Sequence, residues 1–298
     1  MLTSAFRLTA LAALLACAAA PAAADAATSA DSSADAAPVQ EGAERHYQEC
    51  VTRAEQNPEE AVTLATRWRD TGGGIPAKHC LGLALFNAGK ARNAAVAFAQ
   101  AAADLESGKS QLLGGPIRAT PGTIAALYGQ AGNAALVADD PASAYQHFSR
   151  ALGFVSGTPG PQRGNLLIDR ARALAGLKDF KLAKADLDKA VGDLPDSVDA
   201  WLLRAAARRQ LGDLTGARSD AEKAARLAPS EPDVLLERAT LAAMAGDIAA
   251  ARADWQTILK LAPGSDAAAL ARTNLDQAPP EAGAPAAPAK QRAKQSAK

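Results

Sequence analysis

The sequence contains few aromatic residues and few cysteines, and its positive and negative charges balance. Aromatic residues make up 4% of the 298 positions, and there are only three cysteines. The 32 basic and 32 acidic residues cancel, so the composition does not imply nonspecific attraction to nucleic acid or to an anionic membrane. Beyond the first 24 residues, no run of about 18 uncharged apolar residues occurs, so no transmembrane helix is expected.

The motifs of common catalytic and metal centres are also missing. The three histidines are scattered, no two have the i, i+4 spacing, and the zinc motif H-E-x-x-H is absent. Gly82 and Gly89 stand too far apart for a phosphate-binding loop, and Ala91 follows Lys90 where Ser or Thr is required. No G-x-S-x-G nucleophile elbow is present. We therefore expect no catalytic residue, no cofactor and no metal site.

Hydrophobic residues are abundant, at 48% of the chain, and most of the excess is alanine. Alanine has the highest intrinsic helix propensity, and its small side chain lets helices approach closely. The composition therefore favours an all-α protein with tightly packed helices.

A repeat with a period of about 34 residues runs through positions 164 to 264. Four residue types recur at this constant interval, in the sets Pro195, Pro229 and Pro263; Ala183, Ala217 and Ala251; Arg170, Arg204 and Arg238; and Asp186, Asp220 and Asp254. A fixed period of this length is the signature of stacked helix–turn–helix units. Each unit has room for two helices of about a dozen residues, and neither helix can bury its apolar face alone.

The middle copy resembles the tetratricopeptide repeat family. It has Trp201 early in its first helix, Gly212 and Asp213 at the turn, Ala217 and Ala224 in its second helix, and Pro229 at its end. The resemblance implies a right-handed α-solenoid of six helix pairs, closed by a C-terminal capping helix. It also implies a concave face, formed by the first helix of each pair, that binds a peptide or a partner protein.

The first 24 residues are predicted to be a signal peptide. Arg7 precedes a short apolar run, and the small residues at 22–24 precede Asp25. The expected location is therefore the bacterial periplasm. In the alternative interpretation, the segment is a lipoprotein signal, Cys17 is lipidated and the protein is attached to the outer membrane.

The sequence predicts the following layout: a disordered linker at 25–41, a solenoid at 42–277 and a disordered Ala/Pro-rich basic tail at 278–298. Within the solenoid, the expected repeats are 42–74, 75–108, 125–158, 164–197, 198–231 and 232–265, followed by a capping helix at 266–277. The insertion at 109–124 contains helix-breaking glycines and prolines, and it is either a bridging loop or a functional one. A short Pro/Gly linker is expected at 159–163.

If the signal is removed, Cys50 and Cys80 are the only cysteines that remain. An even number of cysteines in an exported chain favours a disulfide, and these two fall on the first helices of adjacent repeats. The alternative is a pair of buried free thiols.

The recurring arginines and aspartates are interpreted as structural ion pairs. Arg170 and Asp186, Arg204 and Asp220, and Arg238 and Asp254 share one constant separation, which places one member on each helix of a unit. A packing feature must be copied into every repeat, whereas a ligand site is rarely copied three times. Loss of one partner from such a buried pair would leave an unpaired charge.

The expected function is that of a non-enzymatic interaction scaffold in the cell envelope. Helical spacing places a set of mainly apolar and amide residues in the concave groove: Phe86, Asn87, Asn133, Arg172, Leu202, Arg209, Leu236 and Thr240. The two arginines are expected to fix the polarity of the bound segment. Ile168, Leu83 and Leu136 share this register, although the two leucines equally suit packing between first helices. The alternatives are an outer-membrane lipoprotein assembly factor and a cell-wall hydrolase.

Overall fold

The computed structural model describes residues 36–108, 111–112, 115–116 and 120–279. These residues form thirteen helices and two short strands. The chain divides into two compact units, Met1–Asp213 and Leu214–Lys298, referred to below as unit 1 and unit 2. The predicted signal peptide, with Cys17, lies outside the described residues, as does the tail after Pro279.

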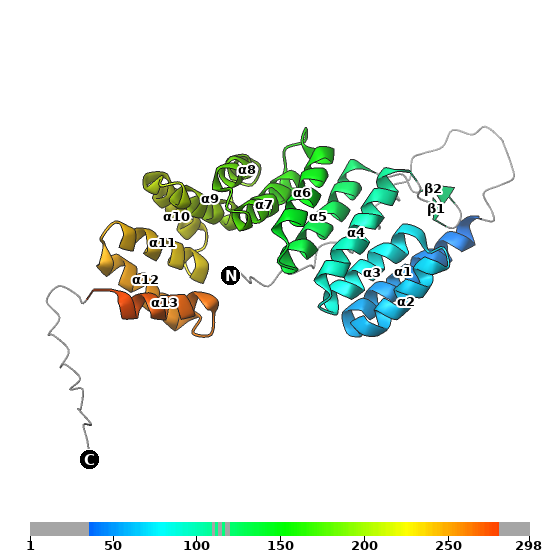
Figure 1. Cartoon of the computed structure of the whole chain (residues 1–298), viewed down its shortest axis with the longest axis horizontal. Coiled ribbons are helices and arrows are strands. Elements are labelled where there is room, and N and C mark those ends of the chain that lie inside the picture. The colour runs from blue at the N-terminus through cyan, green and yellow to red at the C-terminus, as the bar shows by residue number, and fades with distance from the viewer. Residues whose placement is uncertain (1–35, 109–110, 113–114, 117–119, 280–298) are drawn as a thin grey trace, which may run out of the picture. The chain divides into compact units, whose positions relative to one another are not determined.

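Unit 1 contains nine helices and the two strands (Figure 1). In chain order they are α1 (Ala36–Gln56), α2 (Pro58–Asp70), α3 (Gly74–Asn87), α4 (Ala91–Glu106), β1 (Gln111–Leu112), β2 (Gly115–Pro116), α5 (Pro121–Val137), α6 (Pro141–Val155), α7 (Pro161–Gly176), α8 (Phe180–Asp193) and α9 (Val198–Gln210). The two strands pair antiparallel, with Leu112 opposite Gly115.

Unit 2 contains the remaining four helices of the described chain. They are α10 (Leu214–Leu227), α11 (Pro232–Met244), α12 (Ile248–Leu261) and α13 (Asp266–Gln277). The last of these coincides with the predicted capping helix. The side chain of Ser265 accepts a hydrogen bond from the amide of Ala268 at 3.1 Å, which caps the first turn of α13.

The helices stack in the order of the sequence. In unit 1 each helix from α1 to α9 packs against the next, and first helices of successive pairs also contact each other, namely α1 with α3, α5 with α7, and α7 with α9. In unit 2, α11 packs against both α12 and α13. Figure 1 shows this succession of antiparallel helix pairs. The all-α solenoid predicted from the sequence is confirmed.

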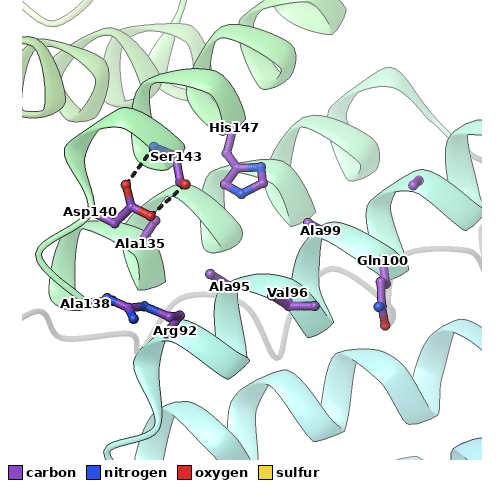
Figure 2. Close-up of a pocket in the computed structure, with 11 residues that line it drawn as sticks. Arg92, Ala95, Val96, Ala99, Gln100, Ala135, Ala138, Asp140, Ser143 and His147 are labelled. Atoms are coloured by element: carbon purple, nitrogen blue, oxygen red, sulfur yellow. Dashed lines mark hydrogen bonds between the residues drawn. The ribbon is translucent and has the colours of Figure 1, made fainter.

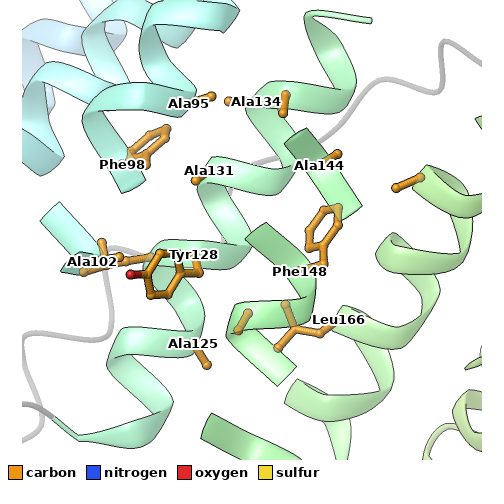
Figure 3. Close-up of a cluster of buried hydrophobic side chains, with 14 of the residues drawn as sticks. Ala95, Phe98, Ala102, Ala125, Tyr128, Ala131, Ala134, Ala144, Phe148 and Leu166 are labelled. Atoms are coloured by element: carbon orange, nitrogen blue, oxygen red, sulfur yellow. The ribbon is translucent and has the colours of Figure 1, made fainter. Parts of the chain in front are cut away.

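Small residues on first helices make room for aromatic rings on second helices. A Cβ atom added at Gly82 would lie 2.5 Å from the ring of Phe98, and one added at Gly132 would lie 2.6 Å from the ring of Phe148. Both phenylalanines are fully buried among alanines, and Figure 3 shows this core around Phe98, Tyr128 and Phe148. Close packing of this kind explains why so much alanine supports a stable fold with few aromatic residues.

Three predicted helix or linker boundaries are wrong, and in two of them the reason is that a proline begins a helix where the sequence was expected to form a loop. Helix α5 begins at Pro121, inside the expected insertion at 109–124, and α7 begins at Pro161, inside the expected linker at 159–163. Proline breaks a helix at an interior position, but the first helical position needs no amide hydrogen, so proline starts a helix well there. Helix α1 begins at Ala36, inside the expected disordered linker at 25–41.

The turns between paired helices need a left-handed backbone at one position. Gly212 and Gly246 take φ values of 81° and 82°, and Lys178, at the equivalent position one repeat before Gly212, takes a φ of 62°. Glycine adopts this conformation without a steric penalty, whereas lysine does not. One repeat therefore keeps a strained residue where its two successors have glycine.

No helix among the described residues is long and apolar enough to cross a membrane.

Candidate partner-binding face

A buried chain of three polar side chains joins successive first helices in unit 1. The Tyr47 hydroxyl of α1 lies 2.7 Å from Nδ1 of His79 in α3, and Nε2 of His79 lies 3.0 Å from Oε1 of Gln130 in α5. One neutral tautomer satisfies both contacts: Nδ1 accepts from the tyrosine, and Nε2–H donates to the glutamine. Burial lowers the pKa of His79 to about 4, and burial raises the pKa of Tyr47 to about 12.

A second polar network continues across the next first helices. Arg172 of α7 donates to Asp169 on the same helix at 2.5 Å and to Asp199 of α9 at 2.6 Å. Burial raises the pKa of Asp169, and this effect outweighs the opposing influence of the Arg172 guanidinium and of a hydrogen bond from Asn133 in α5. Two carboxylates therefore surround one guanidinium, and the network links α5, α7 and α9.

Six of the predicted groove residues belong to unit 1. Phe86 of α3 is half-buried and packs against the core, while the Asn87 side chain donates to the backbone oxygen of Ala54 at 2.9 Å. Asn133 of α5 is half-buried, and its Oδ1 has no hydrogen-bond partner in the described structure. The others are Arg172, which is engaged as above, and the half-buried Leu202 and Arg209 of α9.

Three further residues of this register lie deeper than predicted. Ile168 is only 4% exposed and belongs to the core of unit 1, so its predicted place in the groove is wrong. Leu83 and Leu136 are half-buried and pack against the same core, as in the alternative interpretation of these two leucines. Helical spacing alone does not distinguish a groove position from one covered by the neighbouring first helix.

The remaining two predicted residues, Leu236 and Thr240, lie on α11 in unit 2. Leu236 is half-buried and packs against the core formed by α11, α12 and α13. The Thr240 hydroxyl donates to the backbone oxygen of Leu236 at 2.8 Å, one turn earlier in the helix. These two residues therefore form a set separate from the six in unit 1.

A hollow of roughly 330 Å³ lies between second helices α4 and α6, at the C-terminal end of α5. Figure 2 shows alanines 95, 99, 135 and 138 along it, with Arg92, Asp140, Ser143 and His147 around them. Asp140 accepts hydrogen bonds from the Ser143 amide and hydroxyl at 3.0 and 2.7 Å, and these bonds lower the pKa of its carboxyl group. The aspartate and serine thus cap α6, and no sequence motif indicated this hollow.

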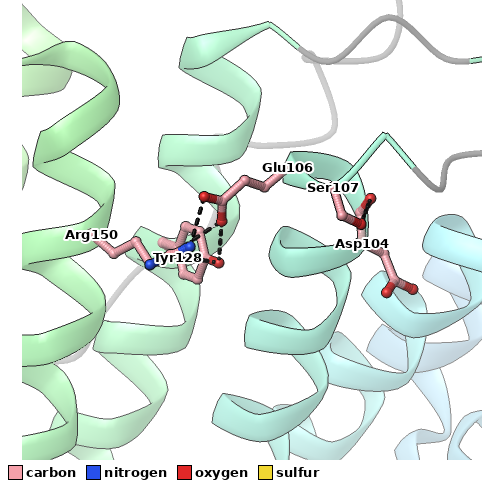
Figure 4. Close-up of polar contacts among 5 residues, drawn as sticks. All are labelled: Asp104, Glu106, Ser107, Tyr128 and Arg150. Carbon is pink, nitrogen blue, oxygen red and sulfur yellow. Dashed lines mark hydrogen bonds and ion pairs between the residues drawn. The ribbon is translucent and has the colours of Figure 1, made fainter.

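A polar cluster fixes the end of α4, where the insertion leaves the solenoid. Glu106 accepts from the Tyr128 hydroxyl of α5 at 2.8 Å and from Arg150 of α6 at 2.7 Å (Figure 4). Hydrogen bonds from Arg150 and from Tyr128 hold the pKa of Glu106 below its usual value. The cluster is absent from the sequence prediction because its three members do not recur in other repeats.

Comparison with solved structures identifies the fold. The chain is similar to PilF of Pseudomonas aeruginosa, with a TM-score of 0.59 at 16% identity over 80% of this chain and 98% of that one. It is also similar to TTC0263, a thermophilic TPR protein of Thermus thermophilus, with a TM-score of 0.50 at 18% identity over 68% of this chain and 99% of that one. No family model and no curated protein matches the sequence.

This is the tetratricopeptide repeat fold.

Two of the three Arg–Asp pairs join the helices of a single tetratricopeptide repeat. Arg170 donates two hydrogen bonds to Asp186, both of 2.7 Å, and Arg238 donates two to Asp254, at 2.6 and 2.7 Å. Arg204 and Asp220 are both buried, but they belong to different units, so their pairing remains a prediction.

The first two tetratricopeptide repeats are joined covalently. A disulfide links Cys50 of α1 to Cys80 of α3, 30 residues apart, with their Cα atoms 6.2 Å from each other. Among the described residues, no group of three or more His, Cys, Asp or Glu side chains is arranged to hold a metal ion.

Proposed function

We propose that this protein is a non-enzymatic interaction scaffold of the bacterial cell envelope. It binds a peptide or a partner protein on the face formed by the first helices of its repeats. The observation that carries the proposal is the row of partly exposed apolar and amide side chains on these helices, including Phe86, Asn133 and Leu202. Solenoids of this type present extended surfaces to partners, and aliphatic or aromatic anchors are typical of peptide recognition.

The polar network on α7 and α9 restricts the chemistry of the partner. Arg172 is already paired with Asp169 and Asp199, so it contributes to partner orientation through this network and not as a separate cation. With its guanidinium matched by two carboxyl groups, this network offers no free positive charge to attract an acidic tail or a nucleic acid strand. We therefore expect a partner segment with aliphatic anchors and few acidic groups.

Location in the periplasm rests on the sequence of residues 1–24. Cleavage after Ala24 would release a scaffold free in the periplasm, whereas lipidation of Cys17 would attach the same scaffold to the outer membrane and suit an assembly factor. Mass spectrometry of the mature N-terminus separates these two forms. A chain that begins at Asp25 excludes the lipoprotein, and a diacylated Cys17 excludes the free periplasmic form.

A crosslinking pull-down from native envelopes tests the binding face. The double variant Phe86→Ser and Leu236→Ser removes one apolar anchor from each unit, and we expect it to lose most partner capture while it remains folded, with a melting temperature lowered by the loss of the core contacts that both residues make. Leu182→Ser is the matched control, because Leu182 lies on the second helix α8 and is 48% exposed. Capture by the folded double variant at the level of the control would place the binding site elsewhere, at the α4–α6 hollow or the insertion.

A further inference from the structure

Unit 2 contains a hollow of roughly 280 Å³ between α11, α12 and the end of α13. None of the described residues that line it carries a formal charge, and its lining includes Thr240, Met244, Ile248, Trp255, Asn274 and Gln277. One edge is fixed by Arg252, whose guanidinium donates to the backbone oxygens of Ala278 and Pro279 at 3.0 and 2.6 Å. The lining is therefore uncharged and mixed in polarity, and the Arg252 guanidinium at its edge is bonded to two backbone oxygens.

Trp255 gives this hollow an unused hydrogen-bond donor. The residue is only 4% exposed, and its indole Nε1 is buried without a partner in the described structure. A buried indole N–H normally finds an acceptor, because an unsatisfied one destabilises the fold by about 1–3 kcal/mol. The donor therefore calls for an acceptor from outside the described chain.

Two other repeats have phenylalanine, which has no polar atom to satisfy, at the position that corresponds to Trp255. Trp255 is the eighth residue of α12, and Phe98 and Phe148 are the eighth residues of α4 and α6. Both phenylalanines are buried in the same way as Trp255. A second helix of this fold can therefore pack against its first helix without a polar atom at this position, so packing alone does not require the indole N–H.

We propose that this hollow binds an uncharged, extended segment of the partner chain. A backbone carbonyl of that segment accepts a hydrogen bond from Trp255, and an aliphatic side chain packs against Met244 and Ile248. Asn274 and Gln277 complement further backbone groups. The described lining residues carry no formal charge, and the Arg252 guanidinium at the edge already donates to Ala278 and Pro279, so the hollow favours an uncharged segment. The inference rests on the proposed function and specifies a site within it.

Access to the indole requires movement of a neighbouring side chain. Met244 lines the hollow, is 52% exposed and is unbranched, so it can change rotamer at little cost. The proposal requires this movement to uncover the N–H of Trp255, which is buried.

The test uses the full chain labelled with ¹⁵N and a short capped peptide of alanine, proline and leucine. The chain has three tryptophans, so Trp68, Trp201 and Trp255 give three indole resonances, each assigned by replacement with phenylalanine. We expect a saturable downfield shift of the Trp255 resonance alone. A capped peptide with aspartate in place of leucine should cause no shift. Absence of a Trp255 shift, or equal shifts with both peptides, would overturn the proposal.

Two variants quantify the contact. Trp255→Phe keeps the ring and should weaken peptide binding roughly tenfold, as expected for loss of one hydrogen bond, while Trp201→Phe should leave it unchanged. Met244→Ser changes an exposed residue and should weaken binding severalfold without unfolding the protein. Unchanged affinity in folded Trp255→Phe and Met244→Ser proteins would refute the assignment.

Two further outcomes separate this site from the proposed function and from another occupant. If folded Trp255→Phe captures the envelope partner as well as the unchanged protein does, the site is wrong and the scaffold function stands. If the unchanged protein captures no partner, the scaffold function is refuted. The proposed site then depends on the peptide titration alone, in which a saturable shift of the Trp255 resonance supports it and the absence of a shift refutes it. If a chain that ends at Pro279 shows a displaced Trp255 resonance without peptide, the occupant is residues 280–298, which overturns the assignment to a partner.

Discussion

Acidification should destabilise unit 1 through His79. The unfolded chain binds a proton on this histidine below a pKa of 6.5, whereas the folded protein binds one only below about 4, because burial disfavours the charged ring. Unfolding therefore takes up a proton between these two values. The contribution of His79 to the free energy of unfolding should be fully present well above pH 6.5, fall as the pH drops from 6.5 to 4, and change no further below that.

The size of the effect follows from the gap between the two pKa values. At about 1.4 kcal/mol for each pH unit, the full loss is about 3 kcal/mol, a large share of the stability of a typical domain. The polar contacts with Tyr47 and Gln130 hold the ring in one neutral tautomer, and neither partner is a carboxylate that could stabilise an imidazolium.

Urea denaturation at a series of pH values from about 7.5 to about 4.5, with the disulfide intact, measures this loss. The comparison protein is His79→Gln, which keeps a donor and an acceptor at the site but does not titrate. Burial lowers the pKa of His147 but raises the pKa of Asp169, and these two shifts change stability in opposite directions as the pH falls, so the slope of the variant is the baseline from which the His79 contribution is measured. Equal slopes for the two proteins would refute the reasoning and show that His79 has the same pKa in the folded and unfolded chain.

Three other changes should alter stability by amounts that thermal and chemical denaturation can resolve. Reduction, or replacement of Cys50 and Cys80 by alanine, should cost about 3–4 kcal/mol by releasing a loop of 30 residues; thiol counting on denatured, unreduced protein checks that the bond is present, and two free thiols would contradict it. Arg170→Ala should cost about 1–3 kcal/mol because it leaves the buried Asp186 carboxylate unpaired, and a wild-type melting temperature would argue against a structural role. Lys178→Gly should raise stability by about 0.5–1 kcal/mol by relieving a left-handed backbone, and a loss of stability would show that the lysine side chain contributes more than the strain costs.

Features that recur with the period were predictable from the sequence. The repeat spacing indicated the helix pairs and the turn at Gly212, because each copy of a repeat solves the same packing problem. The final helix from Asp266 was indicated by the segment after Pro263, in which Ser265 suits the N-cap position. Errors arose where a residue type has two roles. Proline breaks a helix in its interior but also starts one, as Pro121 and Pro161 do, and only the geometry of the preceding residue decides between these roles.

Contacts between unlike residues of different repeats were not predictable. Tyr47, His79 and Gln130 meet through the stacking of three first helices, but their separations of 32 and 51 residues match no period. The carboxylates around Arg172 were missed for the same reason, and they change its expected role from a free cation to part of a network. Pair contacts of this kind depend on the angle between helices, which the pattern of a single helix does not encode.

The indole N–H of Trp255, which has no partner within the described chain, can be related to the residue that faces it on the preceding first helix, as the burial of Phe98 and Phe148 can. Gly82 faces the ring of Phe98 and Gly132 faces the ring of Phe148, and the missing Cβ atom lets each ring approach the first helix closely. Ala239 occupies the corresponding place before Trp255 and is itself fully buried. A larger ring thus meets a first helix that still carries its Cβ atom. The first helix therefore leaves less room for the indole than the glycines leave for the phenylalanine rings, and the indole Nε1 is buried without a partner among the described residues, in a residue that lines the hollow between α11, α12 and α13.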